Sequence, residues 1–178
     1  PTLGRLDEAA GYATCLAAWM IDRHGPVTVD AANRLNLLLH FIEHQTDALT
    51  RRWRRALCLS NQHRDELRDV LRLLGLAAQW PQMTVARRKR LLAHEAWPQT
   101  RRLIEALAIR SLLEPINAEA DELAADGLAP QPLITGQDLI ELGLKPSPRF
   151  GQLLEAMYDA QLEKRVTTRE QALEALRQ

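Results

Sequence analysis

The side chains most able to do chemistry in this sequence are arginines gathered in the middle of the chain. They form three groups: Arg51, Arg52, Arg54 and Arg55; Arg64, Arg68 and Arg72; and Arg87, Arg88, Lys89 and Arg90. A guanidinium group offers a planar fork of donors that fits two phosphate oxygens and also stacks on bases. Basic faces of this kind, with Trp53 close by, favour RNA binding.

The formal net charge is +0 at pH 7, but the charges are unevenly distributed along the chain. Residues 51–110 hold fourteen Lys and Arg against five Asp and Glu, a local surplus of +9. Residues 1–50 hold three against six, and residues 111–178 hold six against twelve. A local surplus can gather an anionic ligand although the whole molecule does not attract one. The alternative is a solvated face whose arginines pair with Asp65, Glu66 and Asp69.

A second candidate for phosphate binding is the turn at residues 143–151, GLKPSPRFG. Pro148 is suited to the first position of a helix, so free N–H groups and a positive dipole end could face a phosphate there. Lys145 and Arg149 would add charge, and Ser147 a hydroxyl donor. The pattern resembles a helix-hairpin-helix clamp. It is equally consistent with a plain turn between two helices.

Catalytic motifs are weak or absent. Residues 40–44, HFIEH, match the H-x-x-E-H pattern of one class of zinc proteases, but no third-ligand motif follows, so we expect no metal site. The sequence contains no GxxxxGK[ST], GxGxxG or GxSxG motif. We therefore predict no catalytic residue in this chain.

The elements that carry these residues are predicted to be helices. Hydrophobic residues make up 46% of the chain and aromatic residues only 4%, which favours an all-α core. Apolar spacing and capping residues predict helices at 6–24, 28–50 and 50–59, and a further helix that starts at Ser60 or Asn61. A helix at 84–94 should end before a break at Trp97-Pro98, and two more helices are predicted at 101–113 and 115–127.

Gly and Pro concentrate in residues 127–132, GLAPQP, and predict a linker. We expect residues 1–129 to form a helical RNA-binding body and residues 130–178 a small three-helix tail with the helix-hairpin-helix-like turn. The tail helices are predicted near 136–142, 148–163 and 168–177. Capping-box patterns at 135–138 and 167–170 predict the starts of the first and third.

The cellular setting is predicted from what the sequence lacks. Cys15 and Cys58 have no CxxC spacing, which favours a reducing compartment over a disulfide framework. No apolar run approaches the roughly eighteen residues of a membrane span, and no signal-peptide pattern opens the chain. We expect a cytoplasmic protein without membrane contact. The chain begins with Pro1, which suggests that it was cut from something longer.

The tail sequence carries a specific ordered pattern. Its elements are Thr135-Gly136, Asp138-Leu139, Gly143-Leu144, Pro146, Pro148, Gly151, Leu153-Leu154, Ala160-Gln161, Thr168 and Glu170-Gln171-Ala172. In this pattern, residues 132–176 resemble the C-terminal tail of the bacterial CCA-adding enzyme and poly(A) polymerase family. Residues 51–65 and 88–92 resemble segments of the family's body, whereas residues 1–50 barely match. Ser147 departs from the second Gly that the family usually has there.

The resemblance implies an RNA-anchoring role. In this family the body and tail hold the tRNA elbow and acceptor arm, while a separate head extends the 3′ end. The head's Gly-Ser, Asp-x-Asp and Glu-Asp-x-x-Arg motifs do not occur here, so Mg²⁺ and ATP or CTP are expected only with that head. The predicted partner is tRNA, held at its phosphates by the arginine groups, Lys145, Ser147 and Arg149.

Two other functions stay open at this point. One is a helix-hairpin-helix DNA-binding module, and the other is a helical adaptor for protein interaction. The sequence leaves the oligomeric state open, and it does not decide whether the parent enzyme adds CCA, only A or only C residues.

Overall fold

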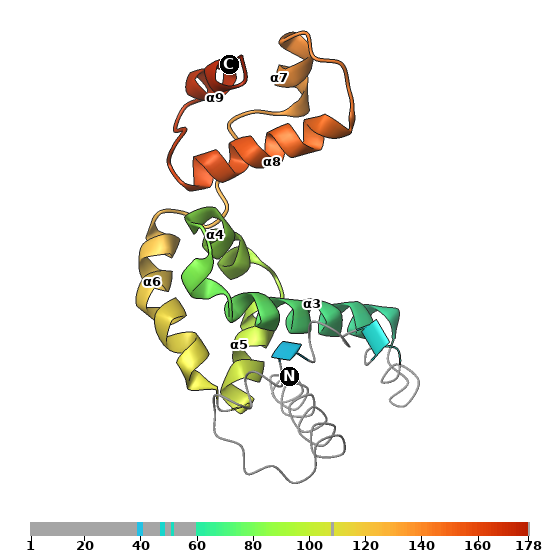
Figure 1. Cartoon of the computed structure of the whole chain (residues 1–178), viewed down its shortest axis with the longest axis vertical. Coiled ribbons are helices and arrows are strands. Elements are labelled where there is room, and N and C mark those ends of the chain that lie inside the picture. Colours follow the sequence, from blue (N-terminus) through green and yellow to red (C-terminus); the bar gives the residue numbers. More distant parts are fainter. Residues whose placement is uncertain (1–38, 41–46, 49–50, 52–59, 108, 178) are drawn as a thin grey trace. The chain divides into compact units, whose positions relative to one another are not determined.

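The computed structural model describes residues 39–40, 47–48, 51, 60–107 and 109–177 (Figure 1). Within these residues the ordered elements are helices, with no strand, so the all-α prediction is confirmed. Two compact units are present: unit 1 comprises residues up to Pro81 and His94–Glu119, and unit 2 comprises Gln82–Ala93 and Ala120–Gln178. The structure does not describe the helix predicted at 6–24 or either cysteine. It describes only four residues of the helix predicted at 28–50 and one residue of the helix predicted at 50–59.

Helix α3 (Asn61–Ala77) is the longest helix of unit 1 among the described residues. It begins as predicted, because the Ser60 hydroxyl accepts a hydrogen bond of 3.1 Å from the His63 N–H. Its apolar face is buried: Leu67, Val70, Leu71, Leu73, Leu74 and Ala77. The predicted spacing of arginines every fourth residue therefore leaves Arg64, Arg68 and Arg72 on the less buried side.

Helix α5 (Trp97–Ala106) corrects the helix predicted at 101–113. It begins earlier because Pro98 stands in its first turn, where the missing N–H costs no hydrogen bond. It also ends earlier, and a 3₁₀ turn, η2 (Arg110–Leu112), separates it from α6 (Leu113–Ala125). The buried Thr100 ties α5 to α3, since its hydroxyl donates to the Ala96 carbonyl at 2.9 Å and lies 3.4 Å from the Val70 carbonyl.

Unit 2 contains the three predicted tail helices and one helix from the middle of the chain. The tail helices are α7 (Gly136–Glu141), α8 (Pro148–Leu162) and α9 (Arg169–Ala175), close to the predicted ranges. Helix α4 (Val85–Ala93) follows the 3₁₀ turn η1 (Trp80–Gln82) and packs on α8, as α7 also does (Figure 1). A hydrophobic cluster of Ile134, Ala160, Val166 and Ala172 forms the centre of the tail.

The caps of unit 2 largely follow the sequence. The box of Thr135 and Asp138 is present at α7. At α9 the cap lies one residue later than predicted: Thr168 is the N-cap, and the side chain of Gln171, not Glu170, accepts from the Thr167 N–H at 2.9 Å. Gly127 follows α6 with a φ of 85°, a left-handed conformation that suits glycine. The domain boundary at residues 129 and 130 stays a prediction.

None of the described helices is both long and apolar enough to cross a membrane.

Candidate nucleic-acid interface

The arginines of α3 share one side of the helix, but each has a carboxylate partner. The ion pairs are Arg64–Asp65 at 2.8 Å, Arg68–Asp65 at 3.4 Å, Arg68–Asp47 at 3.5 Å and Arg72–Asp69 at 3.8 Å. Pairs exposed to solvent contribute little stability, because water screens the charges and ordering two long side chains costs entropy. A phosphate could therefore compete for these arginines, although the neighbouring carboxylates would repel it.

The first arginine group is only partly covered by the structure. Arg51 is exposed, whereas Arg52, Arg54 and Arg55 lie outside the described residues. The same holds for Glu43 and His44 of the H-x-x-E-H pattern. Within the part of the chain that the structure describes, no cluster of three His, Cys, Asp or Glu side chains could hold a metal ion.

Helix α4 divides its basic residues between the surface and the interior of unit 2. Arg87 is exposed and has no carboxylate partner among the described residues. Lys89 is only 2% exposed, and its Nζ lies 3.9 Å from Oδ2 of Asp126. Asp126 also binds Nζ of Lys164 at 2.7 Å, and this hydrogen bond lowers the pKa of the carboxyl. The ammonium of Lys89 is thus turned toward a protein carboxylate in this arrangement.

Arg90 connects α4 to α8. Its Nε donates to Oδ1 of Asp159 at 2.9 Å, and its Nη2 lies 2.6 Å from Oε2 of Glu155. The guanidinium carbon also lies 5.0 Å from the centre of the Tyr158 ring, within the range of a cation–π interaction. The phosphate contacts expected of Lys89 and Arg90 stay a prediction, and in this structure both side chains bind protein groups.

The turn between α7 and α8 brings Lys145, Ser147 and Arg149 to one place. All three are exposed and line a surface hollow of about 430 Å³. Lys145 and Arg149 have no carboxylate partner among the described residues, in contrast to Arg90. The chain reverses at Gly143, whose φ of 82° is left-handed and favours glycine. These three residues were predicted from the sequence, whereas the apolar part of the hollow was not.

That apolar part consists of three side chains that flank the turn: Leu144, Phe150 and Leu153. The only signal for them in the sequence is their position beside the basic residues. Among the described residues, no Asp or Glu lines the hollow.

The start of α8 has an uncommitted hydroxyl group. Ser147 is the N-cap, with extended φ and ψ of −158° and 165°, but its side chain makes no capping hydrogen bond. In α9, by contrast, the Thr168 hydroxyl accepts from the Gln171 N–H at 3.3 Å. Pro148 has no N–H, and the Phe150 N–H donates to the Ser147 carbonyl at 2.9 Å, so the helix favours negative charge here mainly through the positive end of its dipole. The start of α8 therefore lies beside two unpaired cations and an available hydroxyl.

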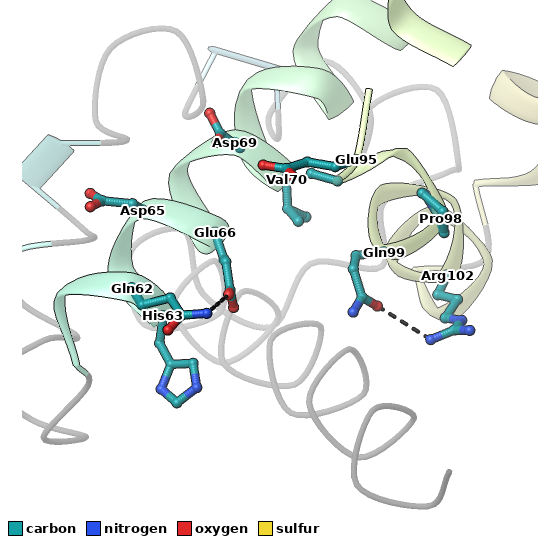
Figure 2. Close-up of a pocket in the computed structure, with 11 residues that line it drawn as sticks. Gln62, His63, Asp65, Glu66, Asp69, Val70, Glu95, Pro98, Gln99 and Arg102 are labelled. Atoms are coloured by element: carbon teal, nitrogen blue, oxygen red, sulfur yellow. Dashed lines mark hydrogen bonds between the residues drawn. The ribbon is translucent and has the colours of Figure 1, made fainter. Parts of the chain in front are cut away.

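Unit 1 contains a second and larger hollow, of about 710 Å³, which the sequence did not predict (Figure 2). Acidic side chains of Asp65, Glu66, Asp69 and Glu95 line it. Figure 2 shows two hydrogen bonds on its walls, from Gln62 to Glu66 at 2.9 Å and from Arg102 to Gln99 at 3.3 Å. Four carboxylates repel phosphate, so the hollow of unit 2 fits a nucleic-acid backbone better.

Comparison with known proteins identifies the family of the chain. The family model for tRNA nucleotidyltransferase domain 2 matches residues 30–176. A stretch of 52 residues, 28% of this chain, is 50% identical to a CC-adding tRNA nucleotidyltransferase of Synechocystis sp.. That stretch spans 12% of the length of the cyanobacterial protein. No solved structure matches the chain.

Proposed function

Because this chain belongs to the tRNA nucleotidyltransferase domain 2 family, we infer that it anchors tRNA while nucleotidyl transfer occurs on a separate catalytic head. In this proposal the parent enzyme adds or repairs the 3′ CCA end in the cytoplasm. The chain itself binds the tRNA and orients its 3′ end toward the catalytic head. No bound metal or nucleotide is required of the residues described above.

The observation that carries the proposal is the hollow at the start of α8. Two exposed cations, Lys145 and Arg149, lie there without carboxylate partners among the described residues, next to the free hydroxyl of Ser147. A surface cation without a partner binds phosphate without first breaking an ion pair. Contacts of this kind position RNA without reading its sequence.

Other basic residues would extend the contact. Arg87 is exposed on α4, which belongs to the same compact unit as the hollow. In unit 1, Arg51 and the exposed ion pairs of α3 offer further phosphate contacts. These are weaker candidates, because each arginine of α3 must exchange a carboxylate for a phosphate.

The test is tRNA binding by fluorescence anisotropy at two salt concentrations, with duplex DNA as competitor. Each phosphate contact contributes about 0.7 to 0.9 to the slope of log K against log salt. The double variant Lys145→Ala/Arg149→Ala should therefore lower the slope by roughly 1.4 to 1.8. The matched control Arg165→Ala/Arg177→Ala removes two exposed charges of the same unit and should leave affinity and slope nearly unchanged.

Three outcomes would count against the proposal. The slope could be the same in the hollow variant and the wild type, or both double variants could weaken binding equally. Preference for duplex DNA over folded tRNA would favour a DNA-binding module instead.

A further inference from the structure

The hollow at the start of α8 has more apolar surface than phosphate binding requires. Leu144 is 38% exposed, and Phe150 and Leu153 are half-buried in its wall. None of the three belongs to the hydrophobic cluster around Ile134 and Ala160. A phosphate group gains nothing from such side chains, because it is strongly hydrated and binds through charge and hydrogen bonds. The apolar wall therefore indicates a ligand with an apolar part.

The charge of the same hollow indicates that the ligand is also anionic. Lys145 and Arg149 line the hollow, and no acidic side chain from the described part of the chain does. Elsewhere in unit 2 the cations Arg90, Lys164 and Arg169 each bind a carboxylate. Like Arg87, the two cations of the hollow have no described carboxylate that neutralises them.

We propose that this hollow binds one unstacked nucleotide of an RNA, with the base against Phe150 and the phosphate held by Lys145 and Arg149. The inference rests on the proposed RNA-binding function and names the part of the RNA that this site takes. The volume of about 430 Å³ falls within the roughly 300–1,000 Å³ usual for small-ligand sites.

An unpaired nucleotide fits the hollow better than a duplex does. In an A-form helix the base faces are stacked on one another, and only edges, sugars and phosphates are accessible. A nucleotide in a loop or at an end can turn its base out and stack it on an aromatic ring. Ser147, whose hydroxyl makes no capping bond, is available as a donor to the phosphate or the ribose.

The experiment compares two short single-stranded RNA probes binding to the full chain. One probe carries a central 2-aminopurine, whose fluorescence falls when it stacks. The other has the same length and charge, but an abasic site replaces the central nucleotide. The wild-type protein should quench the 2-aminopurine and should bind this probe more tightly than the abasic probe.

Two variants separate the base contact from the phosphate contact. Base–aromatic stacking contributes about 1–3 kcal/mol per base. Phe150→Leu keeps an apolar side chain of similar size, so it should weaken the 2-aminopurine probe about fivefold or more. It should leave the affinity for the abasic probe unchanged. Lys145→Ala/Arg149→Ala should lower the affinity for both probes.

The conservative variant Phe150→Tyr keeps the aromatic face and should retain both the quenching and the affinity. This variant keeps the test decisive if Phe150→Leu folds poorly, because loss of quenching in a folded Phe150→Tyr protein would overturn the proposal. The proposal would also be overturned if Phe150→Leu weakened the binding of both probes equally, or if it weakened the binding of neither probe. Neither result would affect tRNA binding through Lys145 and Arg149, which the salt slope measures separately.

Discussion

Arg90 and Asp159 join two helices of unit 2 through a hydrogen bond of 2.9 Å between Nε and Oδ1. The same guanidinium lies over the ring of Tyr158, so one side chain of α4 contacts α8 by charge and by an aromatic face. Arg87 lies on the same helix and has no such partner among the described residues. Two arginines of one helix are therefore expected to respond differently to mutation.

Arg90→Ala should lower the free energy of unfolding of the protein by about 1 kcal/mol, an amount discounted because Arg90 and Asp159 are both more than a third exposed. Asp159→Asn should have a similar effect. Arg87→Ala should change stability by less than about 0.5 kcal/mol, and should lower the salt slope of tRNA binding by roughly 0.7 to 0.9. Urea unfolding and anisotropy measure the two quantities. Equal effects of Arg87→Ala and Arg90→Ala on stability would contradict this division of roles.

Gly151→Ala should raise the stability of the fold and weaken RNA binding. Gly151 lies near the start of α8, and a Cβ placed on it would meet nothing within 4 Å. Alanine favours a helix over glycine by up to about 1 kcal/mol, so the variant should be more stable. We expect weaker RNA binding, because the added methyl group would keep an RNA backbone from approaching the helix closely. A variant that is more stable and binds equally well would show that this glycine has no part in binding.

Ser147→Gly should weaken binding more than it weakens the fold. The φ of Ser147, −158°, is ordinary extended backbone, so serine fits this turn without strain where the family usually has glycine. Glycine is an adequate N-cap, and the loss of stability should be only a few tenths of a kcal/mol. If the hydroxyl donates to RNA, affinity should fall by about 1 kcal/mol, or roughly fivefold. An unchanged dissociation constant would remove the hydroxyl from the interface.

The lowered pKa of Asp138 predicts that the protein loses folding stability in acid. The pKa of its carboxyl is lowered from 3.8 to about 2, chiefly by the backbone N–H of Thr135 and also by Arg169. A lowered pKa means that the unfolded chain binds the proton more readily than the folded one does. This contribution is therefore complete above about pH 4 and is lost as the pH falls toward 2. Thermal unfolding at several pH values should show a smaller decline in Asp138→Asn than in the wild type.

The local features of the fold could be predicted from the sequence. The tail helices, the cap at Ser60 and the buried stripe of α3 each depend on residues within a few positions of one another. The grouping of Lys145, Ser147 and Arg149 also followed from one short turn. Such features are set by capping, proline and helical periodicity, which a single sequence displays directly.

The features that the sequence did not reveal depend on position within a helix or on distant partners. Pro98 is expected to break a helix, but in a first turn the same residue begins one. Lys89 stands in a group of basic residues predicted to contact phosphate, but it follows the buried Ala86 by three positions and so shares its buried face. The carboxylates that bind Arg90 are far away in the chain, and no local pattern identifies them.

Unit 2 is built from two separated stretches of the chain, and this has a consequence for synthesis. Arg90 and Asp159 are 69 positions apart. A ribosome that adds about 5–20 residues per second needs several seconds to make the stretch between them. During that time α4 exists without α8, and the side chain of Arg90 has no carboxylate from α8 to bind. We expect the docking of α4 to be a late event in the folding of the nascent chain, completed only after α8 has been translated.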